Sequence, residues 1–486
     1  MTMMERKLSD LLPGTAMPAD LAVAGLTDDS RQVQPGWLFL AVAGMAHDGR
    51  AFIGDAVERS AAAIFCEPPV PGVDYPVPVI EVPGLSAMRG EIAARFYDSP
   101  SAGMDVIAVT GTNGKTSCSQ FIATALGSAG RPCGVIGTLG YGFPDALKDA
   151  GLTTPDAIGL QRRLAELRDM GCAAVSLEAS SHGLAQGRLS GTEINIGVFT
   201  NITRDHLDYH ETFEDYQDAK RILFTWPGLD AAVINLDDPF AADLVRSVAD
   251  DVTLYTYSLA NSSADIYAES IGYRPDGIDM TVATPWGRGE VSSELLGDFN
   301  ASNLLAVIGV LGQMQFDMAR IVKLVAALSK VPGRMDVLRA AGRPLVVIDY
   351  AHTPDALEKA LLALRRHATG RLWCVVGCGG DRDRGKRPIM GKIASTRADQ
   401  AVITSDNPRT EDPGEIIDQM VAGANSERVQ VEPDRAAAIA LAIGQASGDD
   451  IVLIAGKGHE DYQEVNGERR PFSDFVEVEK LFNRAD

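Results

Sequence analysis

The sequence predicts an α/β protein of about three domains, and three observations lead to this prediction. The chain has 486 residues, which is too long for one core at ~100–200 residues per domain. Short apolar runs typical of buried strands alternate with helical patterns in two separate blocks. Glycine-rich or charged loops follow several of these runs, as in parallel sheets that bind ligands at the carboxyl ends of their strands.

The first predicted domain covers residues 1–97, where short apolar segments at 37–42 and 61–66 lie between turns. The second covers 98–330 and contains a strand at 105–110 followed by a helix at 115–130. Its further expected strands are at 133–138, 173–179, 194–200 and 231–236, with an antiparallel patch within 252–295. A break near 331–334 opens the third domain, 331–486, with expected strands at 344–349, 372–377, 400–404 and 451–455.

Composition narrows the classes of protein that the chain can be. Hydrophobic residues make up 45% and charged residues 23%, as in a folded globular protein. No apolar run approaches the ~18–20 residues that cross a bilayer, and we expect no signal peptide after Met1. The net charge of −22 argues against a general nucleic-acid binder. Phosphates would therefore be bound by local loops and metal ions.

The cysteines show no spacing typical of a zinc site or of a disulfide framework. They are Cys66, Cys118, Cys133, Cys172, Cys374 and Cys378. Scattered through a long chain, they fit reduced and mostly buried thiols, which we expect in a cytoplasmic protein.

A glycine-rich loop joins the strand at 105–110 to the following helix. Its sequence is Thr110-Gly111-Thr112-Asn113-Gly114-Lys115-Thr116-Ser117. Glycines let the backbone wrap a phosphate, Lys115 can reach the outer phosphates, and the Thr116 hydroxyl can hold Mg²⁺. Val109 stands where the strict form of this motif has its first glycine. An ordinary strand-to-helix turn is the alternative, but the context on both sides favours a phosphate loop.

Two further polar loops follow expected strands of the second domain. Glu178 ends one strand, and residues 200–210 after the next include Asp205, His206 and His210. Each loop alone would be interpreted as a solvated surface, but two of them beside a phosphate loop indicate a metal or catalytic site. Lys220, by contrast, has the pattern of a plain surface helix lysine.

The third domain also carries polar loops after its strands. Residues 377–388 form a basic, glycine-rich loop, either an arginine fork for an anion or a solvated turn. Residues 405–409 offer an acid, an amide and a guanidinium, which suit a ligand with an amine and a carboxylate; a simple Asn-Pro turn is the alternative. Residues 456–460 repeat this chemistry after the last strand.

Together and in this order, these motifs resemble those of the Mur ligases, ATP-dependent amide-bond-forming enzymes of bacterial cell-wall synthesis. The resemblance covers essentially the whole chain. The phosphate loop is shared with folylpolyglutamate synthetases, whereas Asp406-Asn407-Pro408-Arg409 is similar to the signature of members that add diaminopimelate. The resemblance implies an N-terminal UDP-binding α/β domain, a central P-loop-type parallel-sheet ATPase domain and a C-terminal Rossmann-like α/β domain.

The resemblance also implies roles for individual residues. ATP would be bound by Gly111, Thr112, Asn113, Gly114, Lys115, Thr116, Ser117, Asn300, Arg334 and Asp349. Mg²⁺ would be held by Thr116, Glu178, His206 and Lys220, the last as a carbamate, and Lys115, Glu178, His206 and Lys220 would act in catalysis.

The substrates implied are UDP-N-acetylmuramoyl-L-alanyl-D-glutamate and meso-diaminopimelate, joined through an acyl phosphate. The first would contact Ser30, Met45, Ala46, His47, Thr153, Thr154, Ser180, Gln186 and Arg188. The second would contact Arg382, Asp406, Asn407, Pro408, Arg409, Gly456 and Glu460. Leu152 and Met45 depart from the family pattern near the first substrate.

Two rival functions remain. A folylpolyglutamate synthetase would use the same loop, but it does not account for the first ~97 residues, which fit a separate UDP-sugar domain. A non-enzymatic nucleotide-binding scaffold would not explain acids and histidines at successive strand ends. We expect a monomer that binds no nucleic acid and does not insert into membranes.

Overall fold

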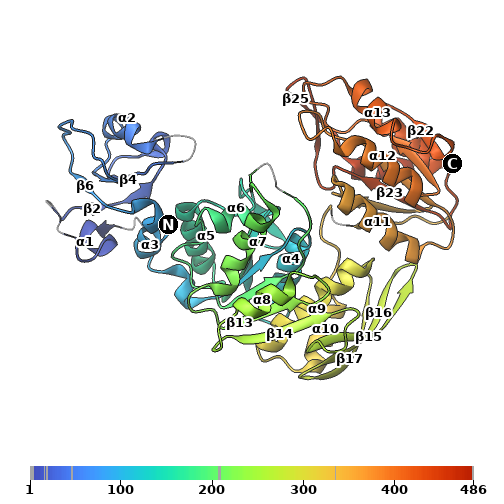
Figure 1. Cartoon of the computed structure of the whole chain (residues 1–486), viewed down its shortest axis with the longest axis horizontal. Helices are drawn as coiled ribbons and strands as arrows, with labels where there is room; N and C mark the ends of the chain where they lie inside the picture. The colour runs from blue at the N-terminus through green and yellow to red at the C-terminus, as the bar shows by residue number, and fades with distance from the viewer. Residues whose placement is uncertain are drawn as a thin grey trace. The chain divides into compact units, whose positions relative to one another are not determined.

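The computed structural model describes residues 5–15, 17, 20–44, 48–205, 209–333 and 335–483 (Figure 1). The chain forms two compact units, Met1–Thr256 and Tyr257–Asp486. Among the described residues, no helix combines the length and apolarity that a membrane span requires.

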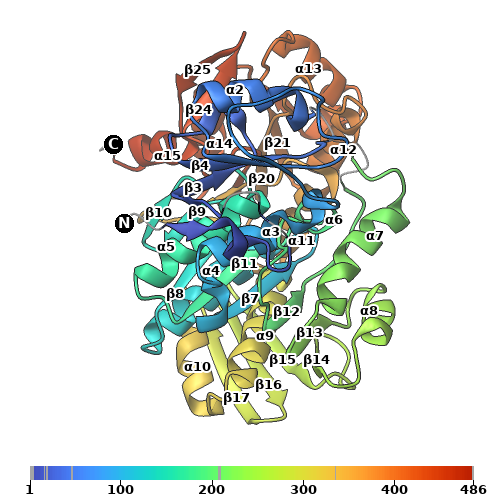
Figure 2. The same cartoon turned by 90° about the vertical axis from the view of Figure 1, so that its left-hand side faces the viewer.

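The N-terminal part of the first unit is a small parallel sheet covered on both faces. Its strands lie in the order β3 (Gly25–Thr27), β4 (Trp37–Ala41), β5 (Ala63–Cys66) and β6 (Val79–Glu81). Helix α2 (Ile53–Glu58) packs on one face, and α1 (Leu8–Leu11) and α3 (Leu85–Phe96) pack on the other (Figure 2). A short antiparallel pair, β1 (Arg6–Lys7) and β2 (Ala22–Val23), adjoins it.

The rest of the first unit is built on a second, mostly parallel sheet. The strands in spatial order are β10 (Ala146–Lys148), β9 (Gly140–Phe143), β8 (Cys133–Gly137), β11 (Ala174–Glu178), β7 (Asp105–Thr110), β12 (Ile196–Phe199) and β13 (Ala231–Asn235). The helices are α4 (Lys115–Ser128), α5 (Ala157–Asp169), α6 (Ser181–Ala185), α7 (Phe213–Arg221) and α8 (Ala241–Ser247). The strands predicted in this stretch are confirmed.

The register of this sheet places the polar loops together. Glu178, the last residue of β11, lies opposite Val109 of β7, and Phe199 of β12 lies opposite Thr110. Because all three strands are parallel, the loops that follow them leave the sheet at the same edge.

The chain passes into the second unit within β14 (Thr253–Ser258). Strands β15 (Ile266–Arg274), β16 (Gly277–Thr284) and β17 (Gly287–Ser293) then form an antiparallel meander, followed by α9 (Asp298–Gln313) and α10 (Met318–Ala326). The expected antiparallel patch within 252–295 is thus confirmed for β15–β17. It is wrong for β14, which pairs with β15 in parallel through Tyr257 and Ser258.

The C-terminal sheet has the order β18 (Asp336–Leu338), β19 (Leu345–Asp349), β23 (Ile451–Ala455), β20 (Leu372–Val376), β21 (Gln400–Ile403) and β22 (Val429–Val431). Only the pairing of β18 with β19 is antiparallel in this sheet, as far as the described residues show. Its helices are α11 (Pro354–His367), α12 (Lys386–Arg397), α13 (Pro413–Val421), α14 (Arg435–Gln445) and α15 (Asp474–Phe482). A hairpin of β24 (Tyr462–Val465) and β25 (Glu468–Pro471) follows β23.

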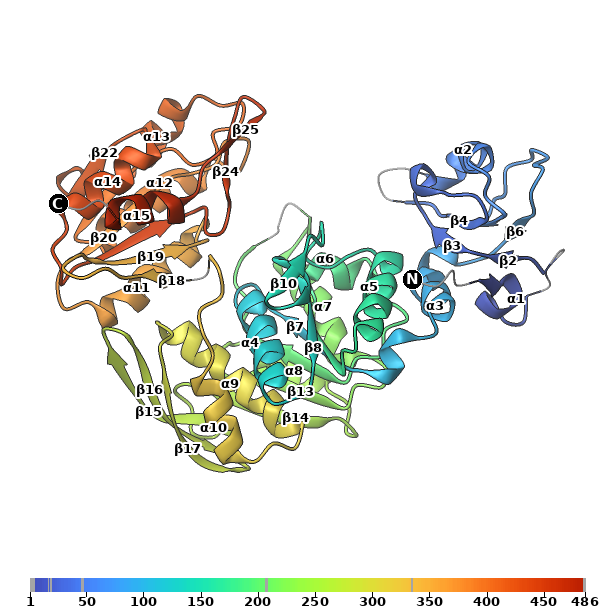
Figure 3. The ribbon, with the colours of Figure 1, turned by 180° about the vertical axis from the view of Figure 1, so that it is seen from behind.

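Side chains alternate between two cores on the faces of this sheet. Cys374 and Val376 of β20 pack with α11, α12 and α13, whereas Trp373 and Val375 pack with α14 and α15. Figure 1 shows α12 in front of the sheet, and Figure 3, from behind, shows α14 and α15 in front. This two-sided burial explains the nearly continuous apolar runs that predicted the strands.

A buried ion pair ties α14 to α15 beneath the carboxyl ends of these strands. Arg435 donates to Asp474 through Nε (2.7 Å) and Nη2 (2.8 Å), and both side chains are 0% exposed. The guanidinium also donates to the carbonyl of Ala455, the last residue of β23, at 3.1 Å.

We predict that Asp474→Asn lowers the free energy of unfolding by about 3–5 kcal/mol, because it leaves a buried guanidinium without its counter-charge. Urea unfolding followed by circular dichroism measures this change. The control is Glu477→Gln on the same helix, which removes an exposed pair with Lys480 and is expected to change stability by less than about 1 kcal/mol. An Asp474→Asn variant as stable as the wild type would contradict the prediction.

Candidate active site

The glycine-rich loop between β7 and α4 has the shape of an anion-binding loop. Gly111 has a φ of +148° and Gly114 a φ of +87°, both in the region that favours glycine. A Cβ on Gly111 would lie 1.9 Å from Thr200 Oγ1, so the close approach of these two loops requires glycine. The Thr112 amide donates to the Asn201 carbonyl at 2.7 Å, which holds the loop open at the N-terminus of α4.

Lys115 lies over this loop. Its ammonium donates to the carbonyls of Gly111 (2.8 Å) and Thr112 (3.0 Å). A cation at the positive end of a helix, with backbone amides beside it, stabilises phosphate oxygens.

Glu178 brings a carboxylate next to the start of α4. Its side chain is buried and accepts hydrogen bonds from Thr116 Oγ1 (3.0 Å), the Thr138 amide (2.8 Å) and Thr138 Oγ1 (3.1 Å). The approach of this carboxylate requires glycine at 137, where a Cβ would lie 2.2 Å from Oε1. Hydroxyl and carboxylate oxygens are the ligands that Mg²⁺ prefers, so Thr116 and Glu178 fit such an ion.

Some predicted site residues lie outside the described residues. They are Met45, Ala46, His47, His206 and Arg334. Within the described ranges, no group of three or more His, Cys, Asp or Glu side chains is close enough to hold a metal ion.

Lys220 is buried, which corrects its interpretation from the residues alone as a surface lysine. It lies on α7 with 1% exposure, and its ammonium lies 4.5 Å from the centre of the Tyr216 ring. Burial, and then the nearby charge of Lys115, lower the pKa of Lys220 well below its usual value, against the opposing effect of Asp205. The Tyr216 hydroxyl is 2.9 Å from Thr112 Oγ1, so α7 is attached to the phosphate loop.

The polar residues after β11 form one connected network. Thr154 Oγ1 donates to the Glu178 carbonyl (2.6 Å) and lies 2.9 Å from Ser180 Oγ. The Arg188 guanidinium donates to the Thr154 carbonyl (2.7 Å) and to Gln186 Oε1 (2.9 and 2.6 Å). Thr153 joins it through Thr138, with the two hydroxyl oxygens 3.1 Å apart. These five predicted substrate contacts therefore lie together, adjoining Glu178.

Ser30 lies in the N-terminal sheet region, where it begins a 3₁₀ turn capped by Asp29, and it is buried. In the second unit, Asn300 lies in the first turn of α9 and donates to the Leu296 carbonyl at 2.9 Å. Asp349 ends β19 and accepts a hydrogen bond from the Met335 amide at 2.8 Å.

The loops after β21 and β23 share a set of hydrogen bonds. Asn407 Nδ2 donates to Glu460 Oε2 at 2.9 Å, and the Glu464 amide donates to Asn407 Oδ1 at 2.9 Å. Lys457, which the sequence interpretation left out of the site, donates to Asn407 Oδ1 (3.1 Å) and Glu460 Oε2 (2.9 Å). The only sequence signal for it was its place within the motif 456–460.

The Asp406 side chain is buried and directed toward Arg435. It accepts from the Asn407 amide at 2.7 Å and lies 3.9 Å from the buried guanidinium of Arg435. Gly456, with a φ of +119°, leaves room for it, because a Cβ there would lie 2.5 Å from Asp406 Oδ2. Asp406 therefore contributes to the shape of the loop.

Arg409 has a φ of +51° and donates from Nη1 to the Gly380 carbonyl at 2.8 Å, while the Pro408 carbonyl packs against Gly380. Among the described residues, no hydrogen bond is made by Arg409 Nη2. Arg382 is exposed. Within the described residues, its side chain makes one hydrogen bond, from Nη1 to the Asp381 carbonyl at 3.2 Å.

The arginine fork expected in the basic loop binds a carboxylate of the chain itself. Arg387 is fully buried and contacts both oxygens of Glu411, at 3.1 and 2.8 Å. The Asp381 amide donates to Glu411 Oε1 at 2.6 Å. This pair joins the loop 377–388 to the segment that follows Arg409.

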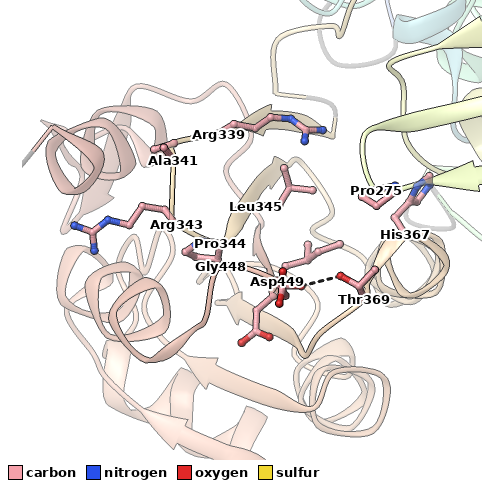
Figure 4. Close-up of a pocket in the computed structure, with 13 residues that line it drawn as sticks. Pro275, Arg339, Ala341, Arg343, Pro344, Leu345, His367, Thr369, Gly448 and Asp449 are labelled. Atoms are coloured by element: carbon pink, nitrogen blue, oxygen red, sulfur yellow. Dashed lines mark hydrogen bonds between the residues drawn. The ribbon is translucent and has the colours of Figure 1, made fainter.

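The cavity in Figure 4 lies elsewhere in the second unit, with a volume of about 520 Å³. It is lined near the start of β19 and β23 by Leu345, His367, Thr369 and Asp449, among others. None of the described site residues predicted from the sequence lines it.

Comparison with known proteins gives three family matches that follow one another along the chain. They are the Mur ligase family catalytic domain at residues 22–97, the Mur ligase middle domain at 109–311, and the Mur ligase glutamate ligase domain at 333–458.

Curated relatives match over nearly the whole length. A UDP-N-acetylmuramoyl-L-alanyl-D-glutamate–2,6-diaminopimelate ligase of Pseudomonas aeruginosa is 50% identical over 480 residues, which are 98% of this chain and 98% of that protein. The ligase of the same name from Coxiella burnetii is 48% identical over 97% of this chain and 99% of that protein.

Solved structures are also similar to this chain over most of its length. A UDP-N-acetylmuramoyl-L-alanyl-D-glutamate–2,6-diaminopimelate ligase is 40% identical, with a TM-score of 0.77 over 99% of both chains. A folylpolyglutamate synthase of Mycobacterium tuberculosis shares the fold at 18% identity, with a TM-score of 0.64 over 82% of this chain and 96% of that one.

The Arg387–Glu411 pair predicts a pH dependence of stability. The hydrogen bonds from Arg387 and then from the Asp381 amide lower the pKa of Glu411 from 4.5 to about 2. A lowered carboxyl pKa stabilises the folded state above the unfolded pKa, and this contribution is lost as pH falls from about 4.5 to about 2. We therefore predict that Glu411→Gln destabilises the protein at neutral pH and less so at about pH 3.

Urea unfolding at both pH values measures this difference, with the exposed Glu415→Gln as the control. An effect of Glu411→Gln that is the same at both pH values would contradict the role assigned to this ion pair.

Proposed function

Because the chain belongs to the Mur ligase family, we propose that it adds meso-2,6-diaminopimelate to UDP-N-acetylmuramoyl-L-alanyl-D-glutamate, at the expense of ATP, in peptidoglycan precursor synthesis. Relatives of this name share about half of their residues with the chain over 97–98% of its length. The whole-chain match carries this proposal, since the phosphate loop alone also suits folylpolyglutamate synthases.

The C-terminal loops support an amino-acid acceptor. Glu460 Oε1 and Arg409 Nη2 make no hydrogen bond within the described residues, and Arg409 Nε lies 3.7 Å from Glu464 Oε2. A carboxylate oxygen suits an ammonium group, and a guanidinium nitrogen suits a carboxylate. We assign the acceptor site to Arg382, Asp406, Asn407, Pro408, Arg409, Gly456 and Glu460.

The chemistry begins with a carboxylate that is inert to amines because its leaving group is poor. The side-chain carboxylate of D-glutamate attacks the γ-phosphoryl group of ATP, forming an acyl phosphate and releasing ADP. Lys115 and the amides of the loop 111–117 stabilise the phosphate oxygens. The amine of diaminopimelate attacks the acyl carbon, loses a proton, and phosphate leaves as the amide forms.

Mg²⁺ would be held by Thr116 and Glu178, together with His206 and a carbamate on Lys220, as the family resemblance implies. When bound, it would neutralise charge on the phosphate oxygens. The burial of Lys220 lowers its pKa and so supports carbamylation, because it is the neutral amine that forms an N–C bond to carbon dioxide with loss of a proton. The carbamate would replace a cation with an anionic oxygen ligand.

We assign the remaining contacts by the same resemblance. Asn300, Arg334 and Asp349 would contact ATP. The UDP-linked substrate would contact Ser30, Met45, Ala46, His47, Thr153, Thr154, Ser180, Gln186 and Arg188. The six cysteines are free and buried, which fits the cytoplasmic location that we propose. We also propose that the chain works as a monomer.

Phosphate release from ATP, measured with the UDP-linked dipeptide and either meso-diaminopimelate or L-lysine, tests the reaction directly. We expect release with diaminopimelate and little with lysine. Release mainly with lysine would keep the ligase chemistry and overturn the proposed acceptor. Release only with folate and glutamate would assign the chain to the rival function.

Lys220→Ala is expected to lower kcat by about a hundredfold or more, since removing one charge-stabilising group from a transition state costs roughly 10²–10³ in rate. Carbon-13 NMR in labelled bicarbonate is expected to show a carbamate signal in the wild type that is absent from this variant. Arg221→Gln, the next residue of α7, is the control. A wild-type spectrum without a carbamate signal would refute the modification, whatever the activity of the variant.

A further inference from the structure

Lys457 is a buried lysine for which the proposed reaction has no role. It follows β23, between Gly456 (φ +119°) and Gly458 (φ +53°), and its side chain is 0% exposed. An ammonium group removed from water destabilises the fold unless partners replace its hydration. Its partners are Asn407 Oδ1 at 3.1 Å and Glu460 Oε2 at 2.9 Å, and the ring of Tyr462 lies 5.5 Å away.

These contacts use one carboxylate oxygen of Glu460, whereas the other oxygen makes no hydrogen bond within the described residues. Oε2 accepts from both Lys457 Nζ and Asn407 Nδ2, each at 2.9 Å. Oε1 accepts from none of the residues that the structure describes. The Glu460 side chain is 17% exposed, so it is accessible yet held in one orientation.

The same lysine fixes the orientation of the Asn407 amide. Oδ1 accepts from Lys457 and from the Glu464 backbone amide, so the NH₂ group is directed to Glu460. An asparagine turned over would place its NH₂ group against two donors. The loops after β21 and β23 are therefore locked together through one ammonium group.

We propose that Lys457 is a positioning residue for acceptor binding: it aims the free oxygen of Glu460 at the ammonium group of the incoming amino acid. This inference rests on the proposed function, because it takes Glu460 to face that substrate. Lys457 itself is fully buried, so it acts through Glu460, both directly and through the Asn407 amide that donates to Glu460.

Lys457→Met tests the proposal, because it keeps the length of the chain and removes the charge and the donors. The KM for diaminopimelate is expected to rise by about tenfold to a hundredfold, the effect of losing a hydrogen bond to a charged group. The KM values for ATP and for the UDP-linked dipeptide are expected to stay within about twofold. Lys457→Gln, which keeps a donor of shorter reach, is expected to give a smaller rise and serves if the methionine variant does not fold.

Glu460→Gln and the double variant complete the cycle. Since Lys457 acts through Glu460, the double variant is expected to show no greater rise in KM than the larger single one, whereas independent effects would multiply. Lys480→Met is the matched control, because Lys480 forms an exposed pair with Glu477 at the same spacing of three residues.

The outcomes separate the two proposals. A wild type that does not use diaminopimelate would overturn the proposed function. A wild type that uses it, together with folded Lys457 variants of unchanged KM for diaminopimelate or with multiplying effects in the cycle, would overturn the role of Lys457 alone. Equal rises in the KM of all three substrates would indicate a general structural role and would also overturn it.

Discussion

Neighbouring parallel strands in both large sheets end at one edge, and this shared direction decides where the chemistry can be. β7, β11 and β12 deliver the phosphate loop, Glu178 and the loop that starts at Thr200 to one place, because Glu178 and Phe199 lie opposite Val109 and Thr110. In the second unit, β21 and β23 end at one edge with β20 between them, and the loops that follow bring Asn407 and Glu460 together. Polar groups far apart in sequence thus meet beyond the carboxyl ends of parallel strands.

Burial then separates two kinds of cation. Arg435, Arg387 and Lys457 are each fully buried and each meets a carboxylate, of Asp474, Glu411 and Glu460 respectively. Such pairs fix the segments that they join. Lys220 is as deeply buried, and its ammonium group contacts the face of the Tyr216 ring. Burial lowers its pKa. The paired cations suit a rigid frame, whereas a lysine with a lowered pKa suits the modification proposed for Lys220.

Apolar strands and their polar ends could be predicted from the sequence, whereas the burial and the partners of individual charged side chains could not. The central strands of both sheets were predictable because runs such as 105–110 and 451–455 are apolar on both faces, whereas the short strands β9, β10, β18 and β22 were not predicted. The phosphate loop and Glu178 were predictable because strand ends converge. The burial of Lys220 was not, because the polar sequence of α7 hides which side packs on the phosphate loop. Lys457 and Arg435 were missed as well, since Lys457 also binds Asn407, 50 residues away, and Arg435 binds Asp474, 39 residues away, and such pairing is a tertiary property.

The acceptor loops illustrate how specificity arises from atoms that the fold leaves unsatisfied. The Asp406 side chain accepts a hydrogen bond from the Asn407 amide of its own loop. The side-chain amide of Asn407 both donates and accepts, and Glu460 Oε2 accepts two hydrogen bonds. Each of these hydrogen bonds occupies a donor or an acceptor that a ligand could otherwise use. Within the described residues, Glu460 Oε1 and Arg409 Nη2 make no hydrogen bond, while Arg409 Nε lies 3.7 Å from the Glu464 carboxylate. Under the proposed function, a ligand that brings an ammonium group and a carboxylate would supply hydrogen-bond partners to these two atoms.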